Sequence, residues 1–159
     1  LAEYLEETYP DAPSLFGGPG GRAAARFIER WSLVNVQAPL MPVILFGVYD
    51  GLAPDDQAYF RRSREARFGK SLEEVAAGQD AALAAYPAKL EPLRQTLSLQ
   101  PYLGGETPLF SDYIVFGGLQ WARVISPITL LADDDPVSVW FERCLDLFHG
   151  AGRKVPAAA

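Results

Sequence analysis

The sequence predicts an all-α protein, a single bundle of about five to six helices. Apolar residues recur at helical spacing in several stretches, whereas no stretch alternates apolar and polar residues as a strand does. Helix-start signals precede these stretches, the clearest being Ser71 with Glu74 and Asp135 with Pro136. The 159 residues are enough for one domain with a substantial core.

Residues 113–126 are predicted to form the central helix of this bundle. Apolar residues lie on every face of its helical projection, and only Gln120 and Arg123 interrupt them. A helix that is apolar all round is buried on all sides, so we expect other helices to surround it. Gly117 and Gly118 each cost roughly 1 kcal/mol relative to alanine in a helix, so we expect a neighbouring helix to pack closely there.

Asp112 stands in the first turn of this helix, three residues after Leu109. An acid at that position can accept the backbone N–H of the N-cap residue, and it lies in the positive field of the helix N-terminus. We therefore assign Asp112 a structural role as a cap and no catalytic role.

The chain opens with a short helix and a linker. Residues 1–9 place Leu1, Tyr4 and Leu5 on one face and acids on the other, a short amphipathic helix with little of this chain to pack against. Residues 11–21 are rich in glycine and proline, a composition typical of a linker.

Two helices are expected next. Residues 22–49 repeat apolar side chains at helical spacing, but Pro39 and Pro42 each remove a backbone hydrogen bond, so we expect a kink or a break there. Residues 53–68 have acids in the first turn and arginines towards the end, as the helix dipole favours.

The C-terminal half continues the pattern. Residues 71–99 form an apolar stripe that Pro87 and Pro92 divide into collinear or kinked segments. Residues 135–149 carry a regular i, i+3, i+4 stripe, and residues 150–159 are expected to be a loose tail.

Composition excludes several functions. A net charge of −6 argues against nucleic-acid binding, because the one basic patch, RRSREAR at 61–67, is diluted by Glu65. We interpret that patch as a solvated helix face, with an anion or partner contact as the alternative. The single histidine makes a histidine-based metal site improbable, and the longest apolar run, 38–49, is too short to span a bilayer. We expect no metal and no membrane partner, a cytoplasmic location, and an inert, buried thiol at Cys144 on the stripe of the last helix.

The run from Pro101 to Val124 resembles a known family. It is similar to the helix that carries the N-capping signature in the C-terminal domain of cytosolic glutathione transferases. The matching residues are Leu103, Gly104, Gly105, Asp112 and Tyr113. Leu109 replaces the capping Ser or Thr of the family, so only half of the capping box is present.

Two further stretches support this resemblance. The opening LAEYLEETYP is similar to the last helix of the thioredoxin-like domain, and DDDPVSVWFERCLDLF is similar to a late helix of the same fold. The combination looks most like the etherase-type branch, shared by bacterial lignin β-etherases and their fungal relatives.

The resemblance implies a domain organisation. Residues 1–10 would be the end of the thioredoxin-like domain, 11–21 the linker, 22–149 the helical C-terminal domain and 150–159 the tail. In this family the thioredoxin-like domain holds and ionises glutathione, so the chain would be part of a longer enzyme and inactive alone. Its start at Leu1, within a helical pattern, agrees with that expectation. The complete protein would be a homodimer.

The helical domain of the family lines the site for the electrophilic co-substrate, a small hydrophobic or aromatic molecule. The matching stretch makes Trp31, Val34, Asn35 and Ala38 the candidate wall residues, each of which ordinary helix packing also explains. No residue of the chain is assigned a catalytic role.

Two alternatives stay open. The chain could be a glutathione-transferase-like module that mediates protein association without catalysis. It could also be an unrelated acidic helical bundle. A strand–helix–strand pattern upstream of Leu1, with a Ser, Tyr or Cys near its start, would favour the enzyme.

Overall fold

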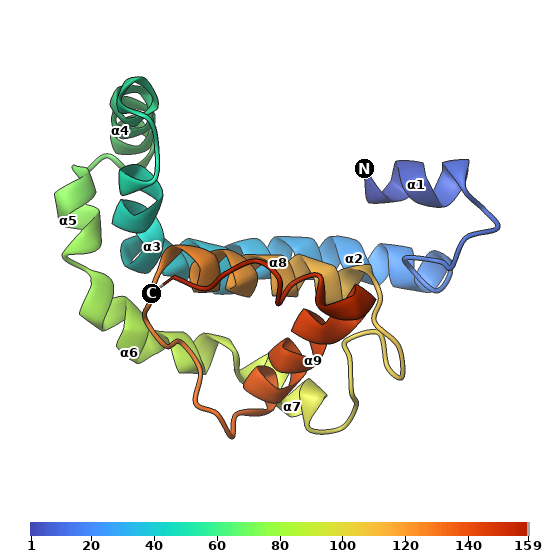
Figure 1. Cartoon of the computed structure of the whole chain (residues 1–159). Helices are drawn as coiled ribbons and strands as arrows, with labels where there is room; N and C mark the ends of the chain where they lie inside the picture. The colour runs from blue at the N-terminus through green and yellow to red at the C-terminus, as the bar shows by residue number, and fades with distance from the viewer. Residues whose placement is uncertain (159) are drawn as a thin grey trace.

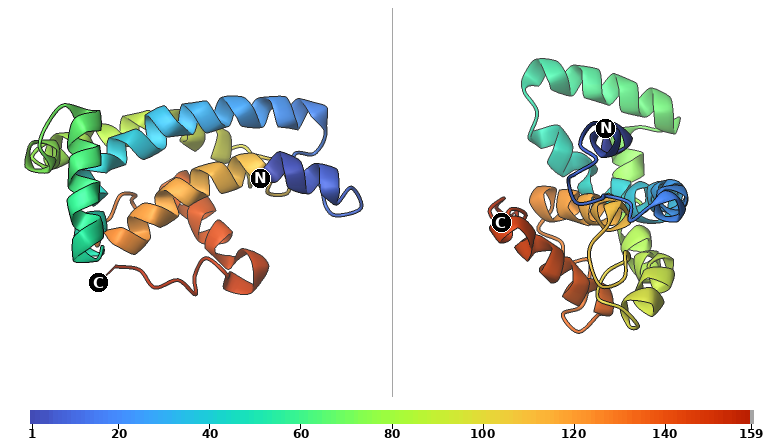
Figure 2. Two further views of the ribbon diagram at one scale, coloured as in Figure 1. Left: turned by 90° about the horizontal axis from the view of Figure 1, so that it is seen from above. Right: turned by 90° about the vertical axis from the view of Figure 1, so that its right-hand side faces the viewer.

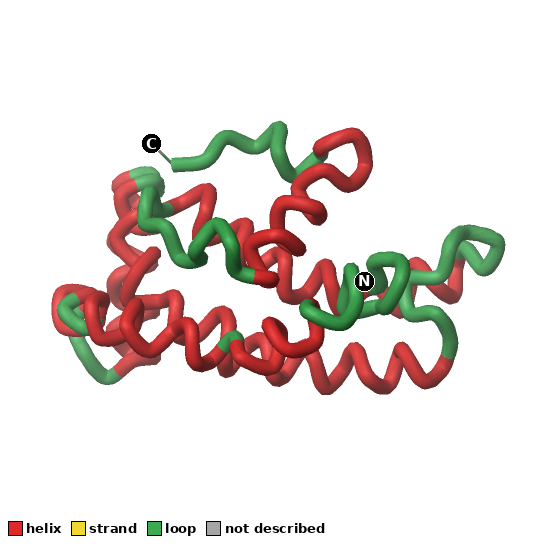
Figure 3. The backbone as a smooth tube through the Cα atoms, turned by 90° about the horizontal axis from the view of Figure 1, so that it is seen from below, coloured by secondary structure: helices red, strands yellow, loops and turns green. Residues whose placement is uncertain are grey.

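The computed structural model describes residues 1–158, and its regular structure is helical (Figures 1 and 3). The predicted all-α fold is confirmed, since those residues contain nine α-helical segments, one π-helical turn and no strand. In chain order the elements are α1 Ala2–Thr8, α2 Pro19–Ser32, η1 Leu33–Gln37, α3 Ala38–Asp50, α4 Pro54–Phe68, α5 Leu72–Ala76, α6 Gln79–Lys89, α7 Glu91–Leu97, α8 Phe110–Ile125 and α9 Pro136–Gly150. The segments outnumber the predicted helices because the first long helix contains the π-helical turn η1, and the predicted helical stretch 71–99 is divided into α5, α6 and α7.

The helices α2, η1 and α3 form one rod, and α8 lies beside it in the same direction (Figures 1 and 2). Phe110, at the start of α8, packs edge-on against Phe16 with ring centroids 5.4 Å apart. At the other end, a Cβ on Gly47 would lie only 2.5 Å from the Ile125 carbonyl oxygen. α5, α6 and α7 return along the rod, and α9 packs on α7 and α8.

Between these elements lies one core. Its most deeply buried side chains come from the rod, α6–α7, α8 and α9: Val36, Leu40, Ile44, Tyr86, Leu90, Val115, Leu119, Val137, Trp140 and Leu145.

The rod is continuous from Pro19 to Asp50, so the predicted interruption at Pro39 and Pro42 is not found there. The irregularity comes just before the prolines, where the Ala38 N–H bonds the carbonyl of Leu33 and closes a π-helical turn. Such a turn inserts one extra residue, which rotates everything after it by about 100° relative to an ideal helix.

By length and composition this rod could cross a membrane, and it is the one such helix within residues 1–158. A core helix of a water-soluble protein meets the same criteria, and 33% of the apolar window is buried inside the bundle. We expected the longest apolar run, 38–49, to be too short to span a bilayer. That expectation is wrong as to length, because the helix that contains the run extends from Pro19 to Asp50.

α8 is not buried on all sides, so that prediction is wrong. Its buried residues, Asp112, Val115, Gly118, Leu119 and Ala122, follow a single stripe. Trp121 keeps 39% of its surface exposed, and Gly117 faces open space. Only Gly118 has a close neighbour, since a Cβ there would lie 3.2 Å from Val36 and Gln37. The other helices cover one side of α8, which leaves the apolar residues on its other side accessible.

The C-terminal tail is anchored, contrary to the expectation of a loose one. α9 bends at Leu147–His149, where Phe148 and His149 adopt positive φ. The chain then runs back along α8. There the Gln120 side chain donates to the Gly152 carbonyl at 2.9 Å, and the Arg123 carbonyl accepts from the Ala158 N–H at 3.0 Å.

The short helix at the N-terminus is confirmed as α1, and none of its residues is buried. It stands apart from the bundle in Figure 1 and is tied to α2 by the exposed ion pairs Glu3–Arg26 and Glu7–Arg22. The linker is shorter than predicted, because α2 begins at Pro19, where the missing N–H of proline is harmless.

Two predicted helix caps are confirmed. Ser71 and Glu74 form a complete capping box at α5. Asp135 caps α9 by accepting the Val137 N–H, and its second oxygen accepts from Arg94 of α7 at 2.8 Å. This contact fixes the two helices relative to each other.

Candidate functional site

Asp112 is a capping residue, as predicted, and it does more. Its carboxylate is fully buried and accepts the N–H of Leu109 at 3.0 Å, which is the half capping box. It also accepts the N–H groups of Leu103 and Gly104 at 2.7 and 3.0 Å and the indole N–H of Trp140 at 2.9 Å. One buried charge therefore joins the 103–109 loop, α8 and α9.

Cys144 is buried in the core, as predicted. Burial raises the pKa of its thiol to about 12, with a smaller contribution from the charge of Asp112. Because the thiolate is the reactive form, this thiol is inert at neutral pH.

The larger of the two principal cavities lies where the rod meets the loop that Asp112 organises. We call it the Trp31 cavity, and its volume is about 530 Å³. It is lined by Leu15, Phe16, Gly21, Ala24, Ala25, Phe27, Ile28, Trp31, Pro92, Leu93, Thr96, Leu103, Gly104, Leu109, Phe110 and Ser111. None of these side chains is charged.

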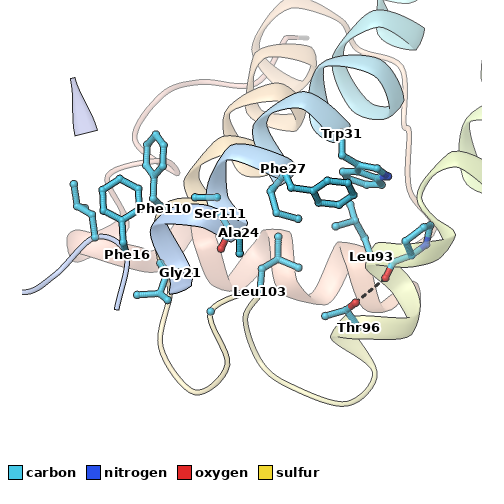
Figure 4. A pocket seen from close by; sticks show the side chains of 16 residues that line it. Phe16, Gly21, Ala24, Phe27, Trp31, Leu93, Thr96, Leu103, Phe110 and Ser111 are labelled. Atoms are coloured by element: carbon cyan, nitrogen blue, oxygen red, sulfur yellow. Dashed lines mark hydrogen bonds between the residues drawn. The ribbon is translucent and has the colours of Figure 1, made fainter. Parts of the chain in front are cut away.

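Figure 4 shows how these side chains are placed. The rings of Phe27 and Trp31 lie side by side on α2, and Leu93 and Thr96 face them from α7. Phe27 keeps 68% of its surface exposed. The Thr96 hydroxyl already donates to the Pro92 carbonyl at 2.8 Å, so the Ser111 hydroxyl and the Trp31 indole N–H are the other side-chain polar groups of the lining. Such a lining suits a neutral aromatic or aliphatic molecule.

A second cavity, the Trp121 cavity, lies near the other end of the rod and has a volume of about 370 Å³. Its walls are η1, α3, α4, the residue Val75 of α5, and Trp121 of α8. The lining residues are Leu33, Gln37, Ala38, Met41, Pro42, Ile44, Leu45, Val48, Phe60, Arg64, Arg67, Phe68, Val75 and Trp121. This cavity is also mainly apolar, but it includes two arginines.

The structure does not bring the four predicted wall residues into one cavity. Trp31 lines the first cavity and Ala38 lines the second. Val34 is exposed over 63% of its surface, and the Asn35 side chain donates to the Trp31 carbonyl at 3.0 Å. In an ideal helix Trp31 and Ala38 share a face, but the π-helical turn between them rotates Ala38 away.

Sequence reasoning missed Phe27 as an exposed ring and Trp121 as a cavity residue, whereas Arg64 and Arg67 belong to the basic patch 61–67 that the sequence had indicated. The spacing of Phe27 and Trp31, four residues apart on a helix, was an available signal. For Trp121 there was none, because a helix that is apolar on all faces does not reveal which face stays accessible.

The residues of the Trp31 cavity do not fit glutathione itself. That tripeptide carries carboxylate groups and an ammonium group, which need charged or backbone partners, and the lining supplies no charged side chain. Within residues 1–158 no group of three or more His, Cys, Asp or Glu side chains is placed to hold a metal ion.

Comparison with known proteins identifies relatives of the whole helical bundle. Residues 23–147 match the family model described as the glutathione S-transferase C-terminal domain. The glutathione S-transferase-like protein ustS of Aspergillus flavus is 27% identical over 134 residues, which are 77% of this chain and 48% of ustS. The chain thus spans about half the length of this curated relative.

Two solved structures share the fold. Glutathione transferase GSTFuA3 from Phanerochaete chrysosporium is 28% identical with a TM-score of 0.69, over 96% of this chain and 59% of that one. GSTFuA2 from the same fungus is 27% identical with a TM-score of 0.57, over 96% and 60%. The family match covers most of the bundle, from the beginning of α2 to the bend in α9, and the chain therefore belongs to the glutathione S-transferase C-terminal domain family.

Proposed function

We propose that this chain is the co-substrate-binding part of a glutathione transferase that acts on aromatic electrophiles, by conjugation or by glutathione-dependent ether cleavage as in the etherase-type branch. The observation that carries this proposal is the uncharged Trp31 cavity, with the exposed ring of Phe27 beside Trp31. An apolar pocket with a few hydroxyl groups is the kind of site that binds a neutral aromatic molecule.

Position also supports this assignment. Leu15 and Phe16 of the cavity wall directly follow α1, the segment that resembles the end of a thioredoxin-like domain. A co-substrate in this cavity would lie near the junction with the domain that holds glutathione. In this proposal the chain's own residues bind and orient the aromatic group and exclude water from it, while the thiol chemistry belongs to the other domain. Val34, Asn35 and Ala38 do not line the Trp31 cavity of this chain, and they remain candidate wall residues of the co-substrate site in the two-domain protein.

The homodimer and the cytoplasmic location stay predictions that rest on the resemblance. The choice between catalysis and the alternative, a non-catalytic interaction module, rests on the resemblance as well.

A retention experiment tests whether glutathione is bound by the other domain and not by this chain. The 159-residue chain should pass through immobilised glutathione, whereas the same chain joined to its thioredoxin-like domain should be retained. Retention of the chain alone would contradict the assignment of glutathione binding to the other domain.

A kinetic experiment tests the cavity in the two-domain protein. Trp31→Ala should raise KM for a neutral aryl co-substrate by about tenfold, the effect of losing one aromatic wall. KM for glutathione should stay the same, because no group of this cavity fits the tripeptide. Leu99→Ala, at an exposed position outside both cavities, is the matched control. An equal change in both KM values, or no change in either, would overturn the proposal.

A further inference from the structure

We propose that the surface between α8 and α9 is a binding site for an extended peptide segment in which a glycine precedes an arginine. Residues 151–158, which we call the strap, occupy this site and run back along α8 (Figure 1). We call the surface under them the strap groove. When the strap leaves, a segment of the same chemistry from another protein takes its place. The groove residues line neither the Trp31 cavity nor the Trp121 cavity, so the inference does not depend on the proposed function.

The groove holds the backbone of the strap at three points along α8. The Gln120 side chain donates to the Gly152 carbonyl at 2.9 Å. The Arg123 guanidinium donates to the Val155 carbonyl at 2.9 Å, and the Arg123 carbonyl accepts from the Ala158 N–H at 3.0 Å. Hydrogen bonds to main-chain groups fit any extended segment, so they supply affinity without selecting a sequence.

One position in the groove selects glycine. A Cβ on Gly152 would lie 2.9 Å from the tip of the Phe116 ring and 3.3 Å from the Cα of Leu145. Both distances are shorter than the usual separation of carbon atoms in contact. The Phe116 ring is itself packed on the ring of Phe141, with centroids 5.3 Å apart, so it has little room to withdraw. A segment with a side chain at this position therefore fits poorly.

The next position selects arginine. The guanidinium of Arg153 donates through Nε to Asp146 at 2.6 Å and through Nη1 to the Glu142 carboxylate at 2.9 Å. Its third nitrogen, Nη2, donates to the Glu142 carbonyl at 3.2 Å. The planar fork of arginine reaches these three acceptors together, which the single ammonium of lysine does not. The contacts are exposed and each is weak, but their arrangement specifies the residue.

The strap is placed in the groove without being locked there. None of residues 151–158 is buried. The bend that directs them onto α8 requires positive φ at Phe148 and His149, 53° and 58°, a conformation that is unfavourable for residues with a Cβ. Release of the strap relieves this strain, so it favours the open groove and partly offsets the contacts that favour the closed one.

The open groove has the features of a peptide site. Its apolar floor includes Phe116 and Leu145, which Gly152 covers in the structure. At its far end lies a third cavity of about 260 Å³, whose lining includes Ala157 and Ala158 of the strap. An apolar floor beside main-chain hydrogen-bonding groups is how many proteins bind an extended segment. The strap is therefore an internal competitor for such a segment.

A strap that only covers apolar surface predicts something different. Such a cover would not distinguish its two basic residues, and a separate peptide would not reproduce it. The two residues differ in contacts, since Arg153 makes two ion pairs whereas Lys154 is exposed and its side chain makes none within residues 1–158. Lys154 therefore provides a matched control for Arg153.

A peptide-binding experiment tests the proposal in the full chain. Gly152→Val should expel the strap by steric overlap, and circular dichroism checks that the helices are intact. The probe is a fluorescein-labelled peptide with the sequence of residues 150–158, GAGRKVPAA, amidated at its end. By fluorescence anisotropy it should bind the Gly152→Val chain. It should not bind the parent measurably, because a tethered strap competes at an effective concentration in the millimolar range.

Variants of the peptide test its chemistry. Within the peptide, Gly152→Val should abolish binding, and Arg153→Met should raise Kd by about fivefold, as expected for lost exposed ion pairs. Lys154→Met should leave Kd unchanged. Failure of the peptide to bind the intact Gly152→Val chain, or equal binding to the parent, would overturn the proposal. So would equal Kd values for the Arg153→Met and Lys154→Met peptides.

Release of the strap is tested separately, in chains that keep Gly152. Phe148→Gly and Phe148→Ala both remove the ring, but only glycine adopts positive φ without strain. Hydrogen exchange of the Ala158 N–H, which reports opening of the strap, should be about fivefold slower in Phe148→Gly than in Phe148→Ala. Equal exchange rates would show that the bend stores no strain and would overturn the proposed release.

Discussion

The two cavities open on the same rod and differ in chemistry. The Trp31 cavity is larger and its lining is uncharged, whereas the Trp121 cavity is smaller and includes Arg64 and Arg67. Trp31 and Ala38 would lie on one stripe of an ideal helix, but here Trp31 lines the first cavity and Ala38 lines the second. One extra residue in a helix can therefore place the side chains of a single apolar stripe in the walls of two cavities.

The two cavities also differ in what holds them together. The wall of the Trp31 cavity includes Gly104 and Leu109 of the 103–109 loop, which depends on the buried carboxylate of Asp112. The Trp121 cavity is closed by α4, a helix without buried residues, whose C-terminal cap is Gly69 in the left-handed conformation. Changes to the Asp112 network should therefore affect one site and spare the other.

The largest expected effect comes from removing the extra residue. Deleting Asn35 should restore an α-helical register and rotate α3, which takes Leu40 and Ile44 out of the core. Each such side chain contributes roughly 1.5–3 kcal/mol on burial, so the loss is comparable to the whole stability of about 5–15 kcal/mol.

Circular dichroism during urea titration measures this effect. Asn35→Ala is the control, because it removes one side-chain hydrogen bond and keeps the register. A deletion variant that unfolds at the same urea concentration as the parent would show that the π-helical turn does not set the orientation of α3.

The next effect concerns the Asp112 network. Asp112→Ala should leave three backbone N–H groups and the Trp140 indole N–H without their acceptor, at a cost of about 3 kcal/mol or more. The free energy of unfolding from urea titration measures the cost. Trp140→Phe removes one donor and keeps most of the apolar volume, so it should cost less. In the folded fraction, a neutral aryl ether should bind more weakly, and unchanged affinity would refute the dependence of the Trp31 cavity on the Asp112 network.

A smaller effect should separate the two cavities directly. Trp31→Ala should weaken binding of a neutral aryl ether by about tenfold, because an aromatic wall contributes on the order of 1.4 kcal/mol. Trp121→Ala should leave that affinity unchanged, because Trp121 lines the other cavity. Isothermal titration calorimetry of the parent and both variants measures the affinities. If both variants weaken binding equally, the two cavities are not independent.

The smallest effect is a pH dependence of the Trp31 cavity. The pKa of Glu6 lies below its ordinary value of 4.5, because its carboxylate accepts the Ser14 hydroxyl and, as a second cause, the Leu15 N–H. A depressed pKa means that the stabilisation is present above the ordinary value and is lost as pH falls through the lowered one. Leu15 and Phe16 belong to the cavity wall, so affinity for the neutral ligand should fall slightly between about pH 5 and pH 3.

The Trp121 cavity should not share this dependence, because neither Leu15 nor Phe16 belongs to its lining. Titrations of the neutral ligand at several pH values measure the effect, and Glu6→Gln should remove it. The same fall in affinity in Glu6→Gln would assign the effect to another group.

Much of the fold could be predicted because it depends on local chemistry. The caps at Ser71 and Asp135 need only two or three neighbouring residues, and both are confirmed. The role of Asp112 as a cap followed in the same way, whereas its bond to Trp140, 28 residues later, could not be read from local spacing.

Other features depend on how distant elements pack. The accessible face of Trp121 is set by which helices happen to cover α8, and the anchored tail depends on Gln120 and Arg123 meeting it. The prolines predicted a kink or a break at Pro39 and Pro42, but the structure has instead a wider, π-helical turn just before Pro39. The candidate wall residues came from the stretch that resembles the family, and the resemblance did not indicate the π-helical turn that places Trp31 and Ala38 in different cavities.

The most direct test of two chemically distinct cavities uses the three tryptophans as reporters, since one lies at each cavity and Trp140 lies in the core. Their indole N–H signals can be followed by nuclear magnetic resonance while a neutral aryl ether is added to the chain. The Trp31 signal should shift, and the Trp121 and Trp140 signals should not respond. A shift of the Trp121 signal without a shift of the Trp31 signal would contradict the account.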